Sequence, residues 1–249
     1  MEGPFKRLDL HVHTPKSLCY LDNVEPGAGR GTQAADIVNA ARAAGLDAIA
    51  VTDHNTAERI DWVREAARDA GLVIFPGVEV TTRAGHLLAL FDPSMPSSHV
   101  AQVVRYLGFK TEEEGDAYYW TNAWMGEACH VIQEAGGVAV AAHVDRRPRG
   151  FIATPEPLSE KQRIYNNEYL SAIEITLPQD KARWNSGAVP NYARRHACLQ
   201  NSDSHAPGEI GRRYTLARVP ELNITWLRTA IQRHDELLRF PHELNGVGL

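Results

Sequence analysis

The sequence of 249 residues predicts an α/β fold built on a parallel sheet. Short apolar runs alternate with helical patterns about seven times along the chain, which is typical of right-handed strand–helix–strand units. Polar side chains gather directly after the apolar runs, at the carboxyl ends where parallel strands meet. No linker or change of composition divides the chain. We therefore expect a single domain over residues 1–249, with a core from about 5 to 237 and a C-terminal tail over 238–249.

Short apolar runs bounded by Gly, Pro or Asp mark the predicted strands. These strands are Phe5–Val12, Leu46–Thr52, Leu72–Phe75 continuing into Val78–Thr82, Gly85–Phe91, Val138–Ala142, Leu170–Leu177, Ala197–Gln200 and Arg213–Val219. Amphipathic periodicity with cap residues marks the helices. These helices are Gln33–Ala44, Thr56–Ala70, Ser98–Leu107, Asn122–Ala135, one beginning at Ser159, Val189–His196 and Ile224–Leu237. The segment Thr14–Gly31 is expected to be a long functional loop.

Composition limits the class of protein. The formal net charge of −5 argues against nonspecific binding of nucleic acid over the whole surface, although a local basic groove stays compatible with it. Cys19, Cys129 and Cys198 are too few and too scattered for a disulfide framework. The N-terminus lacks a secretory signal, and no apolar run approaches the roughly 20 residues that a membrane helix needs. These features predict a cytoplasmic protein without a membrane segment.

The first predicted strand ends in the motif Asp9-Leu10-His11-Val12-His13-Thr14. Strict alternation would place Asp9, His11 and His13 on one face of the strand and the two apolar residues on the other. Two imidazoles spaced this way can converge on one metal ion. An exposed edge strand with solvated histidines is the alternative interpretation.

Other strand ends carry the same residue types, and the chain contains 11 His. A site assembled from so many imidazoles and carboxylates would be costly without metal ions. The count exceeds what one ion binds, so it predicts two or three divalent ions, Mn²⁺, Fe²⁺ or Zn²⁺, of the kind that support hydrolysis. The residues concerned are Asp9, His11 and His13; Asp53 and His54; Glu79 and His86; His143; and Asp203 and His205.

Taken in order, six motifs of this chain resemble those of the PHP (polymerase and histidinol phosphatase) phosphoesterases. They are Asp9–Thr14, Thr52-Asp53-His54-Asn55, Pro76-Gly77-Val78-Glu79, Gly85–Leu90, Ala142-His143 and Ser202-Asp203-Ser204-His205. The resemblance runs from residue 5 to about residue 235. It implies a distorted seven-stranded (β/α)7 barrel of the TIM-like, PHP type, with a trinuclear metal site.

The resemblance also implies a role for each residue. His11, His13, Glu79 and Asp203 would bind the first ion; Glu79, His86 and His143 the second; and His54 and His205 the third. Asp53, Asp203 and His205 would take part in catalysis around a metal-bridging hydroxide, with Asp53 and Asp9 expected mainly to orient histidines.

One position departs from the family pattern. Many PHP proteins carry an Asp or His five or six residues after the second His of the first motif, where this chain has Leu18 and Cys19. Asp22 is the expected substitute ligand. An ordinary turn aspartate is the alternative interpretation of that residue.

Basic and aromatic residues lie in the loops near the predicted mouth. Arg146, Arg147 and Arg149 follow the His143 strand, and Arg212 and Arg213 follow the Asp203 loop. Arginine suits bidentate binding of phosphate, although solvated surface arginine is the alternative. A further cluster, Tyr118-Tyr119-Trp120, could stack on a base or form the small core of a lid, and the second interpretation is favoured.

These observations predict a hydrolase of phosphoric esters that acts on nucleotides or on single-stranded nucleic-acid ends. Two alternatives stay open: a phosphatase of small metabolites, of the histidinol-phosphate type, and a catalytically silent scaffold that binds a partner protein. The segments Thr14–Tyr20 and Ile210–Thr215 resemble PHP modules found beside SMC-like ATPases. This sequence has no P-loop, so the resemblance implies a separate ATPase as partner.

Overall fold

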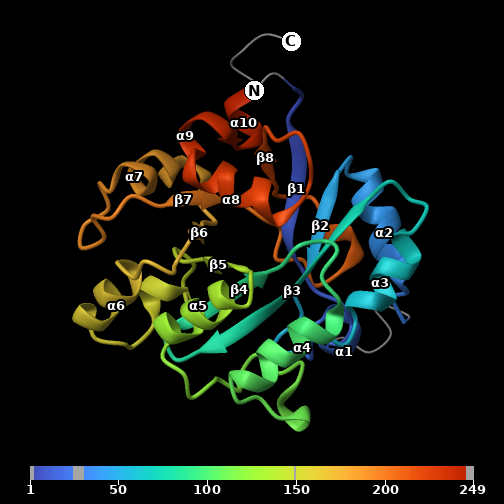
Figure 1. Cartoon of the computed structure of the whole chain (residues 1–249), viewed down its shortest axis with the longest axis horizontal. Coiled ribbons are helices and arrows are strands. Elements are labelled where there is room, and N and C mark those ends of the chain that lie inside the picture. Colours follow the sequence, from blue (N-terminus) through green and yellow to red (C-terminus); the bar gives the residue numbers. More distant parts are fainter. Residues whose placement is uncertain (1–2, 25–30, 149, 245–249) are drawn as a thin grey trace.

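The structure, a computed structural model, describes residues 3–24, 31–148 and 150–244. The strands of this part form one curved sheet in the order β7-β6-β5-β4-β3-β2-β1-β8-β9 (Figure 1). Their bounds are β1 Lys6–Val12, β2 Ala48–Val51, β3 Val73–Thr82, β4 Gly85–Leu90, β5 Val138–Ala141, β6 Ala172–Glu174, β7 Ala197–Leu199, β8 Thr215–Ala217 and β9 Leu238–Arg239. Strands β1 to β8 correspond to the eight strands expected from the sequence, whereas β9 was not expected.

The chain after β7 nearly closes this sheet into a barrel. Ser204 forms a parallel bridge with Val12 at the end of β1, and the His13 amide donates to the Ser204 carbonyl over 3.0 Å. Strands β8 and β9 extend the sheet in antiparallel fashion from the start of β1. The expected barrel class is therefore confirmed, with two additional strands.

Strand β4 differs from the expected parallel arrangement because it runs antiparallel to both β3 and β5. Only Arg83 and Ala84 separate it from β3, which is too short for the crossover that a parallel pair requires. Gly85, at a φ of +114°, begins the return strand. The reversal places the start of β4, and with it His86, at the same end of the barrel as the carboxyl ends of the parallel strands.

Helices cover the outside of the barrel and one of its ends (Figure 1). Their bounds are α1 Leu21–Val24, α2 Ala34–Ala43, α3 Ile60–Ala67, α4 Ser97–Tyr106, α5 Met125–Glu134, α6 Leu158–Tyr165, α7 Lys181–Ser186, α8 Ile224–Gln232, α9 His234–Leu237 and α10 Pro241–Leu244. Helix α8 packs across the end opposite His86, where its Ile224 amide donates to Asp92 and its Arg228 donates to the Gly137 carbonyl. Among the described helices, none has the length and apolar character needed to cross a bilayer.

The register of β1 differs from strict alternation. Its pairing with β2 shifts between Asp9 and Val12, so β1 contains one extra residue there. Leu10 consequently packs in the barrel interior with Ala50, whereas Val12 packs in the outer layer with Val51. A bulge of this kind moves all following side chains to the opposite face. The prediction that Asp9 shares a face with His11 and His13 was therefore wrong.

Two C-terminal features also differ from expectation. No helix forms over 189–196; the preceding segment forms α7, which ends at Gly187 in the left-handed region, and Pro190-Asn191 makes a turn between Val189 and Tyr192. The expected tail extends the core, because Leu238 and Phe240 are fully buried.

We predict that Phe240→Ala destabilises the protein by about 3–5 kcal/mol, because it removes a buried ring that the neighbouring core cannot replace. Urea unfolding followed by circular dichroism measures the loss. Leu158→Ala, at a residue 45% exposed, serves as the control and should change stability by less than about 0.5 kcal/mol. Equal stability of both variants would place Phe240 outside the core.

Candidate metal centre

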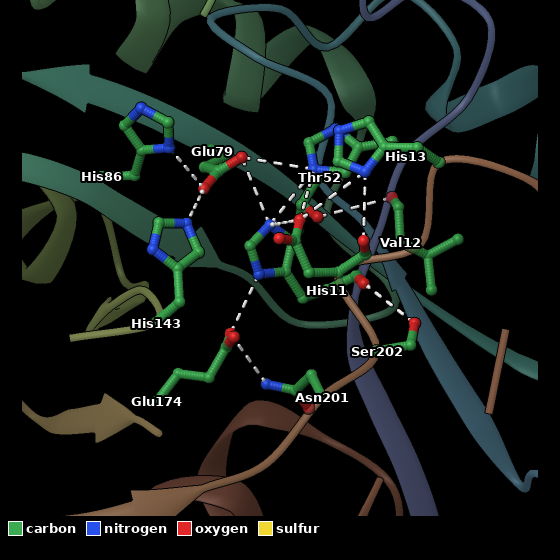
Figure 2. A network of polar contacts seen from close by, with 12 residues as sticks. His11, Val12, His13, Thr52, Glu79, His86, His143, Glu174, Asn201 and Ser202 are labelled. Carbon is green, nitrogen blue, oxygen red and sulfur yellow. Dashed lines mark hydrogen bonds and ion pairs between the residues drawn. The ribbon is translucent and has the colours of Figure 1, made fainter. Parts of the chain in front are cut away.

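Imidazoles and carboxylates from several strand ends converge at the open end of the barrel, called the mouth below (Figure 2). This cluster contains all the predicted ligands whose side chains the structure describes: His11, His13, His54, Glu79, His86, His143, Asp203 and His205. Asp22 lies in α1, but its side chain is outside the described part of the structure, so its role stays a prediction.

Glu79 lies at the centre of the cluster. Its Oε2 is 3.2 Å from the Nε2 atoms of His11 and His13, and 3.1 Å from His54 Nδ1. Its Oε1 is 2.9 Å from His86 Nδ1 and 3.1 Å from His143 Nε2. Oε2 is buried and forms no hydrogen bond of normal geometry. A buried oxygen in this situation is suited to bind a cation.

One group of four atoms has the spacing of a coordination sphere. His11 Nε2 and His13 Nε2 lie 3.2 Å apart, and they lie 3.2 and 3.3 Å from Asp203 Oδ1. Ligand atoms about 2.1 Å from a tetrahedral ion are roughly 3.4 Å from one another. With Glu79 Oε2 as the fourth atom, the group fits a single divalent ion.

Without an ion, protons balance the buried negative charge. Burial would raise the pKa of Glu79, but the positive charge of His11 and its hydrogen bond hold it well below its ordinary value. Burial alone would lower the pKa of His13, because it disfavours the charged ring. Its contacts with Asp203 and Glu79 outweigh this effect and raise the pKa to about 9. A metal ion must therefore displace a proton from His13 at neutral pH.

His205 presents a lone pair to the mouth. Burial and the nearby positive charge of His13 lower the pKa of His205 to about 4, so its ring is neutral at pH 7. Its Nδ1 donates to the Asp203 carbonyl over 3.0 Å, which leaves Nε2 unprotonated. This geometry suits the predicted role of His205 as a metal ligand.

Glu174, on β6, is a functional residue that the sequence did not reveal. His11 Nδ1 donates to its Oε2 over 2.9 Å, and Asn201 Nδ2 donates to the same oxygen over 3.2 Å. The contact orients the His11 ring so that Nε2 faces Glu79 (Figure 2). Asp203 Oδ1 lies 3.2 Å from the same nitrogen. The available signal was a glutamate inside an apolar strand.

Asp53 acts on the site through Ser17. It accepts hydrogen bonds from the Thr14 amide, the Thr14 hydroxyl and the Ser17 hydroxyl, the last over 2.6 Å. Ser17 Oγ in turn accepts from His13 Nδ1 over 2.9 Å. The predicted orienting role of Asp53 agrees with these contacts. They use both of its carboxylate oxygens, so a direct catalytic role receives no support.

Asp9 orients backbone rather than a histidine. Its Oδ1 accepts from the Ser202 amide and its Oδ2 from the Gly211 amide, both over 2.9 Å. The bulge in β1 turns Asp9 away from the mouth, so it fixes the segment that carries Asp203. The prediction that it orients a ring of the cluster was wrong.

The predicted phosphate-binding arginines fall into two groups. Arg146 contacts Asp203 Oδ2 at the mouth with its side chain 35% exposed, and Arg147 is exposed beside it. Arg212 and Arg213 instead donate to the backbone carbonyls of residues 201 and 202, contacts that hold the Asp203 segment. The geometry gives no support for a phosphate-binding role of Arg212 and Arg213. Arg149, the remaining predicted arginine, lies outside the described residues.

The aromatic cluster Tyr118-Tyr119-Trp120 does not form a core of its own, because its side chains are 67%, 50% and 52% exposed. Its loop is nevertheless fixed next to the metal cluster. The Gly115 amide donates to the His54 carbonyl, and the Asn55 side chain donates to the carbonyls of Asp116 and Tyr119. The favoured interpretation as the core of a lid was wrong.

The PHP domain model matches residues 9–173, about two thirds of the sequence. The chain belongs to the PHP domain family. This confirms the family resemblance, with all the motifs except Ser202–His205 inside the matched range, and it agrees with the expected enzyme class, a hydrolase of phosphoester bonds.

Similar proteins extend this comparison. The chain is 26% identical over 145 residues to an uncharacterized protein of Methanocaldococcus jannaschii, covering 55% of this chain and 67% of that one. It is 32% identical over 96 residues to a 5′-3′ exoribonuclease of Haemophilus influenzae, covering 36% of this chain and 31% of that one.

Solved structures share the fold at 18% identity. A lesion-specific endonuclease of Pyrococcus furiosus superposes with a TM-score of 0.67 over 95% of this chain and 57% of its own. A two-domain protein of Bacteroides vulgatus containing a predicted PHP-like metal-dependent phosphoesterase gives 0.61 over 91% and 62%. The PHP chain thus spans only part of these proteins.

We predict that Glu174→Gln lowers metal affinity by about 10–100-fold. The neutral amide would orient the His11 ring less firmly and would make its Nε2 a weaker base. Metal competition with a chromogenic chelator measures the change. Glu134→Gln, at a carboxylate 74% exposed on α5, is the matched control and should leave affinity unchanged. Unchanged affinity in Glu174→Gln would remove Glu174 from the site.

We predict that metal binding releases protons below about pH 9, because His13 carries a proton up to that pH in the metal-free protein. The affinity for metal should therefore fall as the pH falls. Calorimetric titration with Zn²⁺ in buffers of different ionisation enthalpy measures the number released. His13→Gln should release fewer protons, whereas His130→Gln, on the exposed face of α5, should match the unmodified protein. Equal release from both variants would contradict the assignment to His13.

Proposed function

We propose that this PHP protein is a metal-dependent phosphoesterase that acts on nucleotides or on the ends of single-stranded nucleic acid. The observation that carries the proposal is the shared carboxylate of Glu79, which faces His11 and His13 with one oxygen and His86 and His143 with the other. A carboxylate placed in this way can serve two neighbouring ions. The third group of the expected trinuclear site is His54 and His205.

Divalent ions bound here would supply Lewis-acid activation of water and of the phosphoryl group, and would neutralise phosphate charge. The chain itself supplies a rigid set of ligands and, at the rim of the mouth, the positively charged guanidinium of Arg146. Arg146 is paired with Asp203 in this structure. Arg146 contacts Oδ2 of Asp203, whereas Oδ1 faces the histidines, so an ion held by Oδ1 would leave the guanidinium at the rim, where it could bind a substrate phosphate through two donors.

Aromatic side chains beside the mouth support a substrate that carries a base. Tyr119 and Trp120 are half exposed, and Arg83 lies 5.9 Å from the Trp120 ring centroid. Exposed rings next to a cation form the kind of surface on which unpaired bases stack. The names of the Haemophilus exoribonuclease and the Pyrococcus endonuclease point to the same substrate class.

Mn²⁺-loaded protein incubated with a 5′-³²P-labelled single-stranded oligonucleotide should release label as mononucleotide or as inorganic phosphate. Thin-layer chromatography separates these products, and a denaturing gel shows the remaining chain. Asp203→Asn should lower the rate by at least about 100-fold, because it removes a charged ligand. Trp120→Ala should raise KM for the oligonucleotide several-fold while leaving KM for p-nitrophenyl phosphate unchanged.

Tyr106→Ala is the matched aromatic control, because Tyr106 is 78% exposed on α4 and outside the cluster. Equal effects of Trp120→Ala on both substrates would contradict base stacking. Hydrolysis of p-nitrophenyl phosphate with an untouched oligonucleotide would favour the small-metabolite phosphatase. The absence of any hydrolysis by metal-loaded protein would contradict the proposed activity and favour the scaffold.

A further inference from the structure

A groove leads away from the metal cluster on one side of the mouth. Arg146 lines this groove and also contacts Asp203, so the groove and the cluster meet at one side chain. The other lining residues follow β5 and β6. The groove has a volume of about 480 Å³, within the range of roughly 300–1,000 Å³ that is typical of small-molecule sites. A molecule held at the cluster by one phosphate can therefore extend into this space.

Two further arginines line the groove, and the proposed function leaves both without a role. Arg147 is exposed, and within the part of the chain that the structure describes no group accepts a hydrogen bond or an ion pair from its guanidinium. Arg183 is 55% exposed and pairs with Asp180, three positions earlier, over 3.2 Å. An exposed pair of this kind is weak, so both guanidinium groups are available to an anion.

The acidic residues of the groove leave it positively charged, because three arginines face two aspartates. Asp145 is directed at the wall of the groove. Its Oδ1 accepts from the amide and the hydroxyl of Thr176, and its Oδ2 accepts from the Leu177 amide. This carboxylate therefore fixes the segment after β6 and does not take an arginine as its hydrogen-bond partner.

Apolar side chains form the rest of the lining, namely those of Ile152, Leu177, Trp184 and Val189. Leu177 is 43% exposed, which leaves apolar surface open beside the arginines. A free phosphate would not cover this surface. A nucleotide would, because it joins a charged phosphate to a base and a sugar with apolar faces.

The groove and the exposed aromatic residues lie on different sides of the mouth. The loop of Tyr118-Tyr119-Trp120 is bonded to His54 and Asn55, which follow β2. The groove follows β5 and β6, and β3 and β4 lie between these positions in the sheet. A single strand that crosses the metal cluster can thus contact the aromatic residues on one side and the arginines on the other.

We propose that the groove binds the nucleotide beyond the scissile phosphate, with the next phosphate of the strand held by Arg147 and Arg183. The inference rests on the proposed function. It narrows the substrate to phosphodiester-linked single strands, in preference to free mononucleotides. Arg147 and Arg183 are then specificity-determining residues that act on binding and not on the reacting phosphate.

Two substrates of Mn²⁺-loaded protein test this role. The p-nitrophenyl ester of thymidine 5′-monophosphate and single-stranded (dT)6 both contain a phosphodiester, but only (dT)6 has a further phosphate beyond the scissile one. Arg147→Gln and Arg183→Gln should each raise KM for (dT)6 at least fivefold and leave kcat, and KM for the ester, unchanged. Arg68→Gln is the matched control, because Arg68 forms the same three-residue pairing with Glu65 outside the groove and is 69% exposed.

Fluorescence anisotropy of fluorescein-labelled (dT)6 in EDTA measures binding without hydrolysis. Each arginine variant should bind more weakly, and the slope of log affinity against log salt should become smaller by about 0.7, the value for one lost phosphate contact with a single strand. Arg68→Gln should keep both the affinity and the slope of the unmodified protein.

Unchanged KM and binding in both arginine variants, or equal increases of KM for the two substrates, would overturn the role of the groove, while hydrolysis of (dT)6 would still support the proposed function. Weaker binding and a smaller salt slope in both variants, without hydrolysis of either substrate by the unmodified protein, would reject the proposed activity and keep the groove as a strand-binding site.

Discussion

The buried carboxylate of Glu79 is the group on which the arrangement of the mouth depends. Moving such a charge out of water is costly unless opposite charges and hydrogen-bond donors surround it. Five imidazoles from β1, β2, β4 and β5, or from the residues that follow them, approach its two oxygens within 3.2 Å. The strand ends can come this close only because the sheet is curved, so the closed barrel and the charged centre require each other.

A second layer of contacts fixes which ring nitrogen is available. The Nδ1 atoms of His11, His13 and His205 each donate to an acceptor behind the site, namely Glu174, Ser17 and the Asp203 carbonyl. Each Nε2 is directed into the cluster, where it can bind an ion once any proton it carries has left. This part of the site is organised before any ligand arrives, so little rearrangement is needed on binding.

The sequence predicted the features that depend on position along a strand. His54, Glu79, His143 and Asp203 follow or end apolar runs, and parallel topology alone brings such residues together. It could not reveal the bulge in β1, because one extra residue changes the face of Asp9 without altering the apolar pattern. Nor could it reveal Glu174 and Ser17, whose roles depend on partners 163 and 4 positions away that only the fold identifies. The direction of β4 was in principle readable, since a two-residue connection excludes a parallel crossover.

The bridge between Val12 and Ser204 also has a consequence for folding. The hydrogen bond between Leu10 and Asn201 joins residues 191 positions apart, so this seam closes a very long loop and is entropically costly to form. Contacts of such high sequence separation slow folding. His11 and Asp203 lie on the two sides of that seam. Any ligand that binds both residues therefore stabilises the closed barrel. Its binding should slow hydrogen exchange of the β1 amides in addition to changing the chemistry of the mouth.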